Sequence, residues 1–259
     1  FGGNADVVAR AAVMTLERTD CSSIDINGGC PVPKIVKSGA GSMLTKEPER
    51  LYSIVSATKK AVQEYTGLHP ERGEVPVTVK IRSGWDSGSM TWKECTLAAI
   101  EAGADALTIH ARTRAQGYEG KADWDIQRRV VETAGGKIPV FGSGDAHSPE
   151  TAKKMLEETG VDGVMFARGA MGDPFIFKRT IQYLRTGEYQ AETIRERISA
   201  GFRELELNIQ DRGEKAACLL MRKKFCAYSS GIRGGSLLRQ QVVHAESAED
   251  YRRIFAPYL

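Results

Sequence analysis

Cys30 is the residue of this chain whose surroundings are best suited to chemistry. It follows Gly28 and Gly29 and precedes Pro31, just after a short segment, Ser23–Ile26, that is predicted to be a strand. Glycines let the backbone approach a ligand closely because they lack a Cβ, and proline fixes the direction in which the chain leaves. A thiol at the C-terminal end of a barrel strand is placed for catalysis, but free cysteines are also among the most buried residue types. These residues alone leave both interpretations open.

Glycine and charged residues also follow the other four predicted strands. The groups are Lys80, Arg82 and Gly84–Trp85 after the second strand, His110, Arg112 and Arg114 after the third, Gly142–Asp145 after the fourth and Ala167–Ala170 after the fifth. Active sites of parallel barrels are built at this end of the strands. We therefore expect these residues to form one site.

The residue types in these loops favour a phosphorylated cofactor. The loops Gly142–Asp145 and Ala167–Ala170 resemble phosphate sites, in which backbone N–H groups bind the anion and glycine gives them access. Lys80 and His110 suit the electron-rich pyrimidine edge of a reduced flavin, whose negative charge needs a partner. Alternatively, Lys80 reaches from its strand end to water and His110 is a hydrogen-bonded core histidine.

Strand and helix patterns alternate along the chain to about residue 187. The predicted strands are Ser23–Ile26, Val75–Arg82, Ala106–His110, Ile138–Gly142 and Gly163–Ala167. The predicted helices between and around them are Val7–Leu16, Pro48–Glu64, Thr91–Ala102, Asp123–Ala134, Pro149–Thr159 and Pro174–Leu184. Short β-branched runs separated by helices predict a parallel sheet. The rival is an open doubly wound sheet, which usually carries a G-x-G-x-x-G sequence that this chain lacks.

The expected architecture is an α/β, TIM-type (β/α)8 barrel followed by a small all-α domain. The chain opens on Phe1 without a methionine, and only five strands are predicted, so we expect the barrel to be truncated at its N-terminus. Residues 1–187 are predicted to form the partial catalytic barrel and residues 188–259 the helical domain. The predicted helices of that domain are Ile194–Ile209, Gly213–Ser229, Leu237–His244 and Ser247–Phe255.

The positive charge of the chain is concentrated near its C-terminus. Lys and Arg number 36 against 33 Asp and Glu, a net charge of +3. Residues 191–259 hold 12 basic and 9 acidic residues, which accounts for the whole excess. The cluster of Arg222, Lys223, Lys224, Arg233 and Arg239 could bind nucleic-acid phosphates, or it could be a solvated helix face.

Composition excludes several classes of protein. No run of about 18 apolar residues is present, so no membrane span is expected. The five cysteines are odd in number and lack the paired spacing of a metal site. We therefore expect a reducing, cytoplasmic setting without disulfides or a bound metal.

Several segments, taken in order, closely resemble the tRNA dihydrouridine synthases, flavoenzymes that reduce uridine in tRNA. They are D-I-N-G-G-C-P, V-T-V-K-I-R-S-G-W, L-T-I-H-A-R-T-R, P-V-F-G-S-G-D and V-M-F-A-R-G-A-M-G-D-P, followed by M-R-K-K-F and G-I-R-G-G in the helical part. The resemblance covers essentially the whole chain. It implies about three more strands before Phe1, FMN as cofactor, NADPH as reductant, tRNA as substrate and a monomer.

The resemblance also implies a role for each position. Cys30 would be the general acid, and Lys80 and His110 would contact the flavin ring. Ser143, Gly144 and Asp145 would hold the ribityl-phosphate, and Ala167 and Arg168 the phosphate. Asn27, Arg112 and Arg114 would line the uridine pocket or contact RNA, and Arg222, Lys223, Lys224 and Arg233 would bind tRNA. The chain departs from the family pattern at Ser143, where asparagine is usual, and at Ala167, where glycine is usual.

The implied reaction joins two half-reactions. NADPH reduces FMN, the reduced flavin gives hydride to carbon six of a uracil, and Cys30 protonates carbon five from the opposite face. An ordinary thiol, with a pKa of about 8.5, is protonated near neutral pH yet able to donate. One rival is a flavin barrel that acts on a free pyrimidine, such as a dihydroorotate dehydrogenase. The other is an RNA-binding protein without catalysis.

Overall fold

A computed structural model describes all residues from Phe1 to Leu259, which form two compact units. The sheet unit comprises Phe1–Ala146 and Lys154–Met165, and the helical unit comprises His147–Lys153 and Phe166–Leu259. The division passes through helix α6 (Pro149–Thr159), which contributes to both units. The predicted domain division at residues 187 and 188 stays a prediction.

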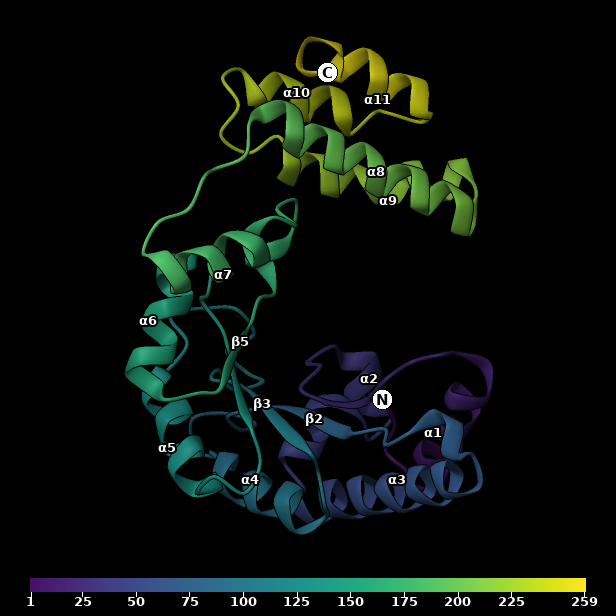
Figure 1. Ribbon diagram of the computed structural model, residues 1–259, viewed down its shortest axis with the longest axis vertical. Helices are drawn as coiled ribbons and strands as arrows, with labels where there is room; N and C mark the ends of the chain where they lie inside the picture. The colour runs from purple at the N-terminus through teal and green to yellow at the C-terminus, as the bar shows by residue number, and fades with distance from the viewer. The chain divides into compact units, whose positions relative to one another are not determined.

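The sheet unit is built on five parallel strands that are hydrogen-bonded in their order along the chain (Figure 1). They are β1 (Ile24–Gly28), β2 (Val77–Arg82), β3 (Ala106–His110), β4 (Val140–Ser143) and β5 (Gly163–Met165). The remaining elements of this unit are α1 (Ala5–Arg18), α2 (Pro33–Lys37), η1 (Gly41–Thr45), α3 (Pro48–Leu68), η2 (Pro70–Arg72), α4 (Trp92–Glu101) and α5 (Trp124–Ala134). A doubly wound sheet reverses its strand order at a switch point. This sheet does not, which confirms the barrel-type arrangement over its rival.

The two faces of the sheet differ sharply in chemistry. Val77, Val79, Ile81, Leu107 and Ile109 are fully buried on the face against which α3, α4 and α5 pack. Because side chains alternate along a strand, the opposite face carries the polar residues. These are Asp25, Asn27, Thr78, Lys80, Arg82, Thr108, His110 and Ser143. The sequence thus sets an apolar core on the helix side and leaves a polar face for a ligand.

Gly142 shows how closely the helices approach the sheet. A Cβ at this position would lie 2.7 Å from Met155 Sδ and 2.8 Å from Gln127 Oε1. Both neighbours are buried, so neither can move aside without opening a gap. Only glycine fits here, because a side chain would collide with Gln127 of α5 and Met155 of α6.

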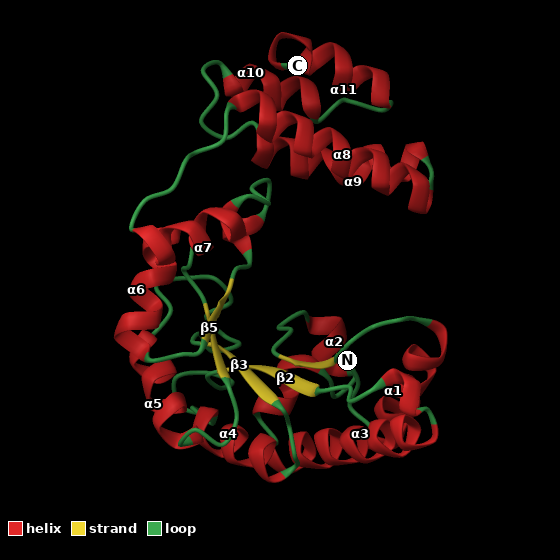
Figure 2. Ribbon diagram, viewed as in Figure 1, coloured by secondary structure: helices red, strands yellow, loops and turns green.

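The helical unit contains the all-α part of the chain (Figure 2). Its elements are η3 (Arg168–Ala170), α7 (Ile176–Thr186), α8 (Ile194–Arg212), α9 (Glu214–Tyr228), α10 (Gly235–Val242), α11 (Ala248–Phe255) and η4 (Ala256–Tyr258). Helix α8 begins at a capping box in which Thr193 and Glu196 bond each other's backbone N–H. The core centres on Phe225, whose ring lies 4.6 Å from that of Tyr251 and 5.0 Å from that of Phe255.

The predicted strands and long helices are all present, with ends shifted by a few residues. Strand β1 continues to Gly28, two residues before Cys30, and β5 ends at Met165 rather than at Ala167. The short elements α2 and η1 were not predicted. Both follow the Cys30 loop directly and lie in a stretch whose glycines, Gly39 and Gly41, have positive φ angles.

Candidate functional site

Asn27 holds the Cys30 loop at the end of β1. Its side-chain Oδ1 accepts hydrogen bonds from the backbone N–H groups of Gly29 and Cys30, both at 3.0 Å. The carbonyl of Cys30 accepts in turn from Ser42 N–H at 2.9 Å. Gly41 packs under the loop, where an added Cβ would lie 2.6 Å from the Cys30 carbonyl oxygen. The thiol is half-buried in a loop fixed on both sides, as a positioned proton donor requires.

The other cysteines lie in different environments. Cys95 is fully buried in α4, and burial raises the pKa of its thiol to about 12. Burial likewise raises the pKa values of Cys218 and Cys226 in α9. Cys21 precedes β1, at the opposite end of the strand from Cys30. Cys30 therefore lies alone among the cysteines at the ligand end of the sheet.

Lys80 and His110 lie on the polar face of the sheet. Burial, followed by the charge of Arg82, lowers the pKa of Lys80 to about 8. Burial, followed by the charges of Arg82, Lys80 and Arg112, lowers the pKa of His110 to about 3. His110 is therefore a neutral imidazole. The Lys80 ammonium makes no hydrogen bond or ion pair with the protein, so this part of the face suits an anion.

Replacing Lys80 with methionine is expected to stabilise the unliganded protein below pH 8. Because the pKa of Lys80 is about 8 in the folded protein and near 10.5 when unfolded, unfolding takes up a proton between these values. The cost of burying the charge is thus complete below pH 8 and disappears above about pH 10.5. The shift allows at most about 3 kcal/mol. Partial exposure reduces the expected gain to about 1–2 kcal/mol.

Urea unfolding of Lys80→Met at pH 7 and at pH 10 checks this expectation. Lys60→Met, at an exposed site on α3, is the matched control and should leave the free energy of unfolding nearly unchanged. A loss of stability in Lys80→Met would instead mean that Lys80 is a structural residue.

Arg112 is buried and pairs with Asp145. Only 1% of Arg112 is exposed, and its guanidinium donates to both carboxylate oxygens of Asp145, at 2.8 and 2.9 Å. It also donates to the carbonyls of Gly120 and Glu119. The sequence predicted that Arg112 would line the uridine pocket or contact RNA. These bonds occupy its Nε and one terminal nitrogen, so they favour a role in fixing the loops after β3 and β4.

The loop after β4 has free backbone donors. The N–H groups of Gly144 and Ala146 donate to no protein acceptor. Gly144 has a φ of +110°, and an added Cβ would lie 2.9 Å from His110 Cδ2. Asp145, the one non-glycine residue with positive φ (63°), has its charge offset by Arg112. The free N–H groups and the buried Ser143 match the needs of a phosphate or ribityl group.

The predicted residues Ala167 and Arg168 belong to the helical unit. Arg168 opens the short helix η3, whose N-terminal flanking residue is Ala167, and both residues are exposed. The backbone N–H of Gly169 donates to no protein acceptor. This loop has the glycine and the free backbone donor expected of a phosphate site.

Arg114 lies over the aromatic ring of Trp85, a residue for which the sequence predicted only a place at a strand end. Its guanidinium carbon is 4.7 Å from the ring centroid of Trp85, and Lys46 Nζ is 5.2 Å from the same ring. Cation–π contacts of this kind hold charged groups in place without neutralising them. Arg114 therefore remains a cation at the strand ends, available to an anionic partner.

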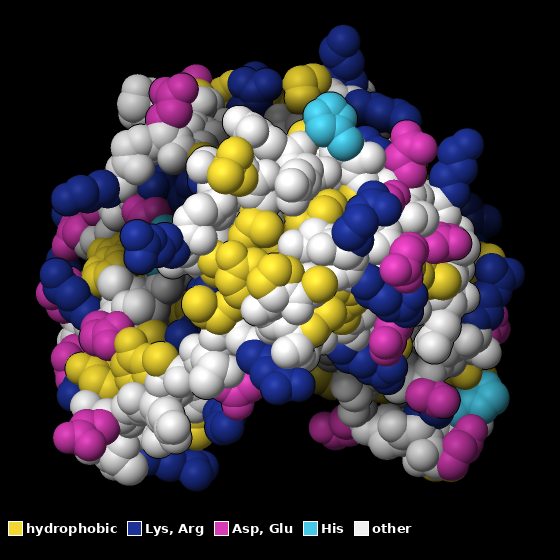
Figure 3. Space-filling model, turned by 90° about the horizontal axis from the view of Figure 1, so that it is seen from above, with side chains coloured by type: hydrophobic (Ala, Val, Ile, Leu, Met, Phe, Trp, Pro, Cys, Tyr) yellow, Lys and Arg dark blue, Asp and Glu magenta, His cyan; other side chains and the backbone are white.

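The predicted basic cluster divides into bonded and exposed members. Lys224 Nζ lies 2.8 Å from Glu204 Oε1, and Arg222 Nε donates to the Ala245 carbonyl at 2.9 Å. Lys223 and Arg233 are exposed and have no ion-pair partner. On the face drawn in Figure 3, Lys and Arg side chains are spread over the surface rather than gathered in one patch.

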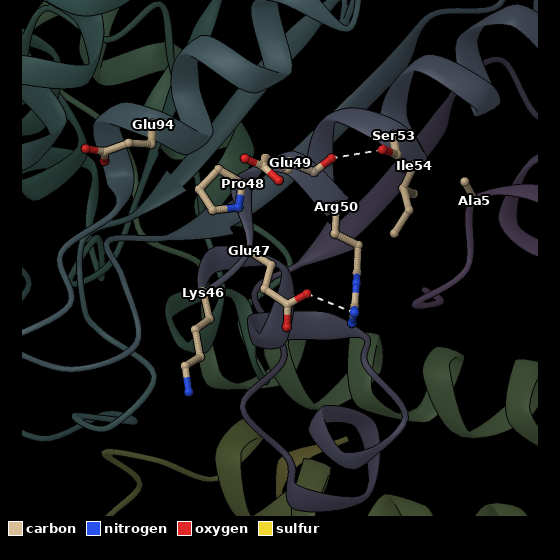
Figure 4. A pocket seen from close by; sticks show the side chains of 9 residues that line it. All are labelled: Ala5, Lys46, Glu47, Pro48, Glu49, Arg50, Ser53, Ile54 and Glu94. Atoms are coloured by element: carbon tan, nitrogen blue, oxygen red, sulfur yellow. Dashed lines mark hydrogen bonds and ion pairs between the residues drawn. The ribbon is translucent and has the colours of Figure 1, made fainter.

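A groove of about 820 Å³ is lined by none of the predicted site residues (Figure 4). It is lined by Ala5, Lys46–Arg50, Ser53, Ile54 and Glu94. Glu47 and Arg50 pair across it at 2.9 Å. The groove carries charges of both signs, and its one hydroxyl, that of Ser53, donates to the Glu49 carbonyl at 2.9 Å.

Arg82 is predicted at a strand end, and the sequence assigns it no role. In the structure Arg82 is only 3% exposed, and backbone carbonyls from two loops accept its hydrogen bonds.

No group of three or more His, Cys, Asp or Glu side chains is placed to hold a metal ion. None of the helices has the length and apolar character needed to cross a membrane.

Comparison with solved structures shows the fold. The ligand-free DHODH of Eimeria tenella superimposes with a TM-score of 0.52 at 17% identity, over 70% of this chain and 55% of that one. The same protein in complex with ferulenol gives 0.50 at 16% identity, over 73% and 58%. At this identity the likeness supports a barrel-type architecture and nothing about the reaction.

Comparison of sequences shows the family. The profile described as "Dihydrouridine synthase (Dus)" matches residues 1–255. The "Probable tRNA-dihydrouridine synthase" of Treponema pallidum is 49% identical over 98% of this chain and 74% of its own length. The "Probable tRNA-dihydrouridine synthase 1" of a Synechocystis species is 37% identical over 96% and 66%. The "tRNA-dihydrouridine synthase B" of Pseudomonas putida is 40% identical over 73% and 52%. The match takes in the polar face and the helical unit alike, and the chain belongs to the dihydrouridine synthase family.

Proposed function

We propose that this protein reduces uridine to 5,6-dihydrouridine in tRNA, with FMN as cofactor, NADPH as reductant and Cys30 as the proton donor. The observation that carries the proposal is the half-buried Cys30 thiol, fixed by Asn27 at the end of β1. Asn27, which fixes this loop, stands on the same face of the sheet as the unpaired Lys80 and the neutral His110. We further propose that the protein works as a monomer in the cytoplasm.

Asn27 has a second use in this proposal. Its Oδ1 is taken by the loop N–H groups, so its exposed amide NH₂ remains as a donor for a carbonyl of the uracil ring. A site that hydrogen-bonds a substrate polar group discriminates strongly against analogues that lack it. Asn27 would thereby orient the base and hold the thiol against it.

The polar face fits FMN at two points. Lys80, as a buried cation without a protein partner, suits the pyrimidine edge of the flavin ring. The free N–H groups of Gly144 and Ala146, with Ser143, suit the ribityl-phosphate, and Ala167 and Arg168 are the proposed partners of the phosphate. Bound FMN would supply the hydride for carbon six of the uracil.

A flavin absorption spectrum tests the cofactor directly. The full-length protein, once purified, is expected to be yellow and to release FMN on heating. Lys80→Met should bind FMN more weakly or lower its reduction potential, because the positive charge that favours the anionic reduced form is gone. A colourless protein that takes up no added FMN would remove the flavin from the proposal and favour a non-catalytic RNA-binding protein.

The helical unit distinguishes tRNA from a free pyrimidine as substrate. A flavin barrel of the dihydroorotate dehydrogenase type does not need an RNA-binding unit, whereas the family profile extends through these helices to residue 255. The target uridine must leave its stack to expose both faces of the ring. Basic side chains of the helical unit would hold the tRNA backbone during this step.

Lys223 and Arg233 are the members of the basic cluster expected to contribute most to tRNA binding. Replacing either with glutamine should weaken binding about equally for all tRNA sequences and reduce the salt slope by roughly one. Lys224→Gln is the matched control, because Lys224 already pairs with Glu204, and it should change the slope less. Filter binding over a range of salt concentrations measures both. Unaltered slopes in Lys223→Gln and Arg233→Gln would identify the cluster as a solvated face.

A further inference from the structure

We propose that Arg82 positions Cys30 for proton donation and stabilises the thiolate that donation leaves behind. The proposal rests on the proposed function of Cys30 and adds a residue that acts through it. Protonation of carbon five breaks the S–H bond of Cys30 and forms a C–H bond, while the bonding pair stays on sulfur. A negative charge therefore develops at a half-buried site during this step. A fixed cation nearby is the feature such a step needs.

Arg82 ties the Cys30 loop to the loop after β3. Its Nε donates to the carbonyl of Gly29, the residue before Cys30, at 2.9 Å. One terminal nitrogen donates to the carbonyls of Thr113 and Gly117, each at 2.9 Å. The guanidinium carbon lies 5.8 Å from the ring centroid of Tyr118. A planar fork with several donors can make these bonds at once, whereas an ammonium cannot.

Arg82 and Asn27 hold opposite sides of the peptide group between Gly29 and Cys30. Asn27 accepts from the N–H groups of Gly29 and Cys30, and Arg82 donates to the Gly29 carbonyl. The peptide plane before the thiol is therefore held at both ends, which limits rotation of the Cys30 backbone.

Arg82 has no carboxylate partner, so its charge is not neutralised. Its acceptors are all backbone carbonyls. Burial is the main cause that lowers the pKa of its guanidinium; Tyr118 and Cys30 raise this pKa and Arg112 lowers it. The guanidinium nevertheless stays charged near neutral pH. A buried cation without a carboxylate partner, bonded to the carbonyl of the residue before Cys30, is costly for folding alone. The cost is explained if the site must accept a negative charge.

Alkylation tests the charge without requiring catalysis. Iodoacetate and iodoacetamide react with the same thiolate, but only iodoacetate is charged. The rate with iodoacetate divided by the rate with iodoacetamide therefore does not depend on the fraction of thiolate and reports the electrostatic potential at the sulfur. In Arg82→Met the ratio at Cys30 should fall by about tenfold, as removing a unit charge several ångströms away predicts, and in Arg82→Lys by less. Peptide mass spectrometry reads each cysteine separately, with Cys21 as internal reference. An unchanged ratio at Cys30 in both variants would overturn the proposal.

A double-mutant cycle tests whether Arg82 acts through Cys30. Single-turnover reduction of uridine should be about 10–100-fold slower in Arg82→Lys than in the wild type. The same change should cost less than about twofold when Cys30→Ala is already present. Equal losses in both backgrounds would mean a general structural role and would overturn the proposal. A wild type that reduces no uridine would refute the proposed function instead, and the alkylation ratios would still stand.

Discussion

Cys30→Ala is expected to slow formation of dihydrouridine by roughly 10²–10⁴-fold, the range typical of general acid–base catalysis. Binding of FMN and oxidation of NADPH should remain nearly intact, because neither requires a proton from the thiol. The loop itself should survive, since its bonds run through the backbone of residues 29 and 30 and the Asn27 side chain. Single-turnover oxidation of the pre-reduced protein by tRNA measures the affected half-reaction alone.

Cys95→Ala is the matched control for this loss. The Cys95 thiol is fully buried in α4, and the substitution should leave the rate of uridine reduction within a few-fold of the wild type. Equal rates for the wild type and Cys30→Ala would show that another group, or water, supplies the proton.

Asp145→Asn is expected to lower the free energy of unfolding by about 3 kcal/mol. The substitution removes the charge that compensates Arg112, which is 1% exposed and cannot reach water. Breaking a buried ion pair by removing one partner typically costs about 3–5 kcal/mol. Asparagine also tolerates the positive φ of this position, so the loss reports the charge rather than backbone strain.

Two further variants isolate this effect in urea unfolding. Glu206→Gln breaks the exposed pair with Arg203 and should cost less than about 1 kcal/mol. Adding Arg112→Met to Asp145→Asn should recover part of the stability, because no unpaired charge is then left buried. If the single change Asp145→Asn costs no more than Glu206→Gln, the loops after β3 and β4 do not depend on this pair.

The sequence predicted the elements that carry strong local patterns. Alternating buried residues such as Val77, Val79 and Ile81 identified β2, and the glycines and proline around Cys30 identified its loop. The expected gathering of strand-end residues on one face follows from the parallel order of the strands. Lys80 and His110 are found there because their strands are regular and the side-chain period is two.

The sequence could not predict which charged residues would be buried and paired. Arg112 and Asp145 are 33 residues apart, and nothing near either residue signals the other. Lys224 was grouped with its neighbours by local charge, but its partner Glu204 lies on another helix. Arg82 was grouped with the strand-end residues but given no role, because its acceptors are backbone carbonyls, which leave no trace in residue types. The contacts that define these roles are tertiary, and the structure is needed to find them.

The most direct test of this account is the mass of a tRNA transcript after incubation with the purified protein, FMN and NADPH. One or more uridines are expected to gain two hydrogens each, and nuclease mapping should place the gain at specific positions. The gain should appear at the same positions with Cys95→Ala and be strongly suppressed with Cys30→Ala. A transcript of unchanged mass, from a protein that holds FMN and oxidises NADPH, would contradict the claim that this protein reduces uridine in tRNA.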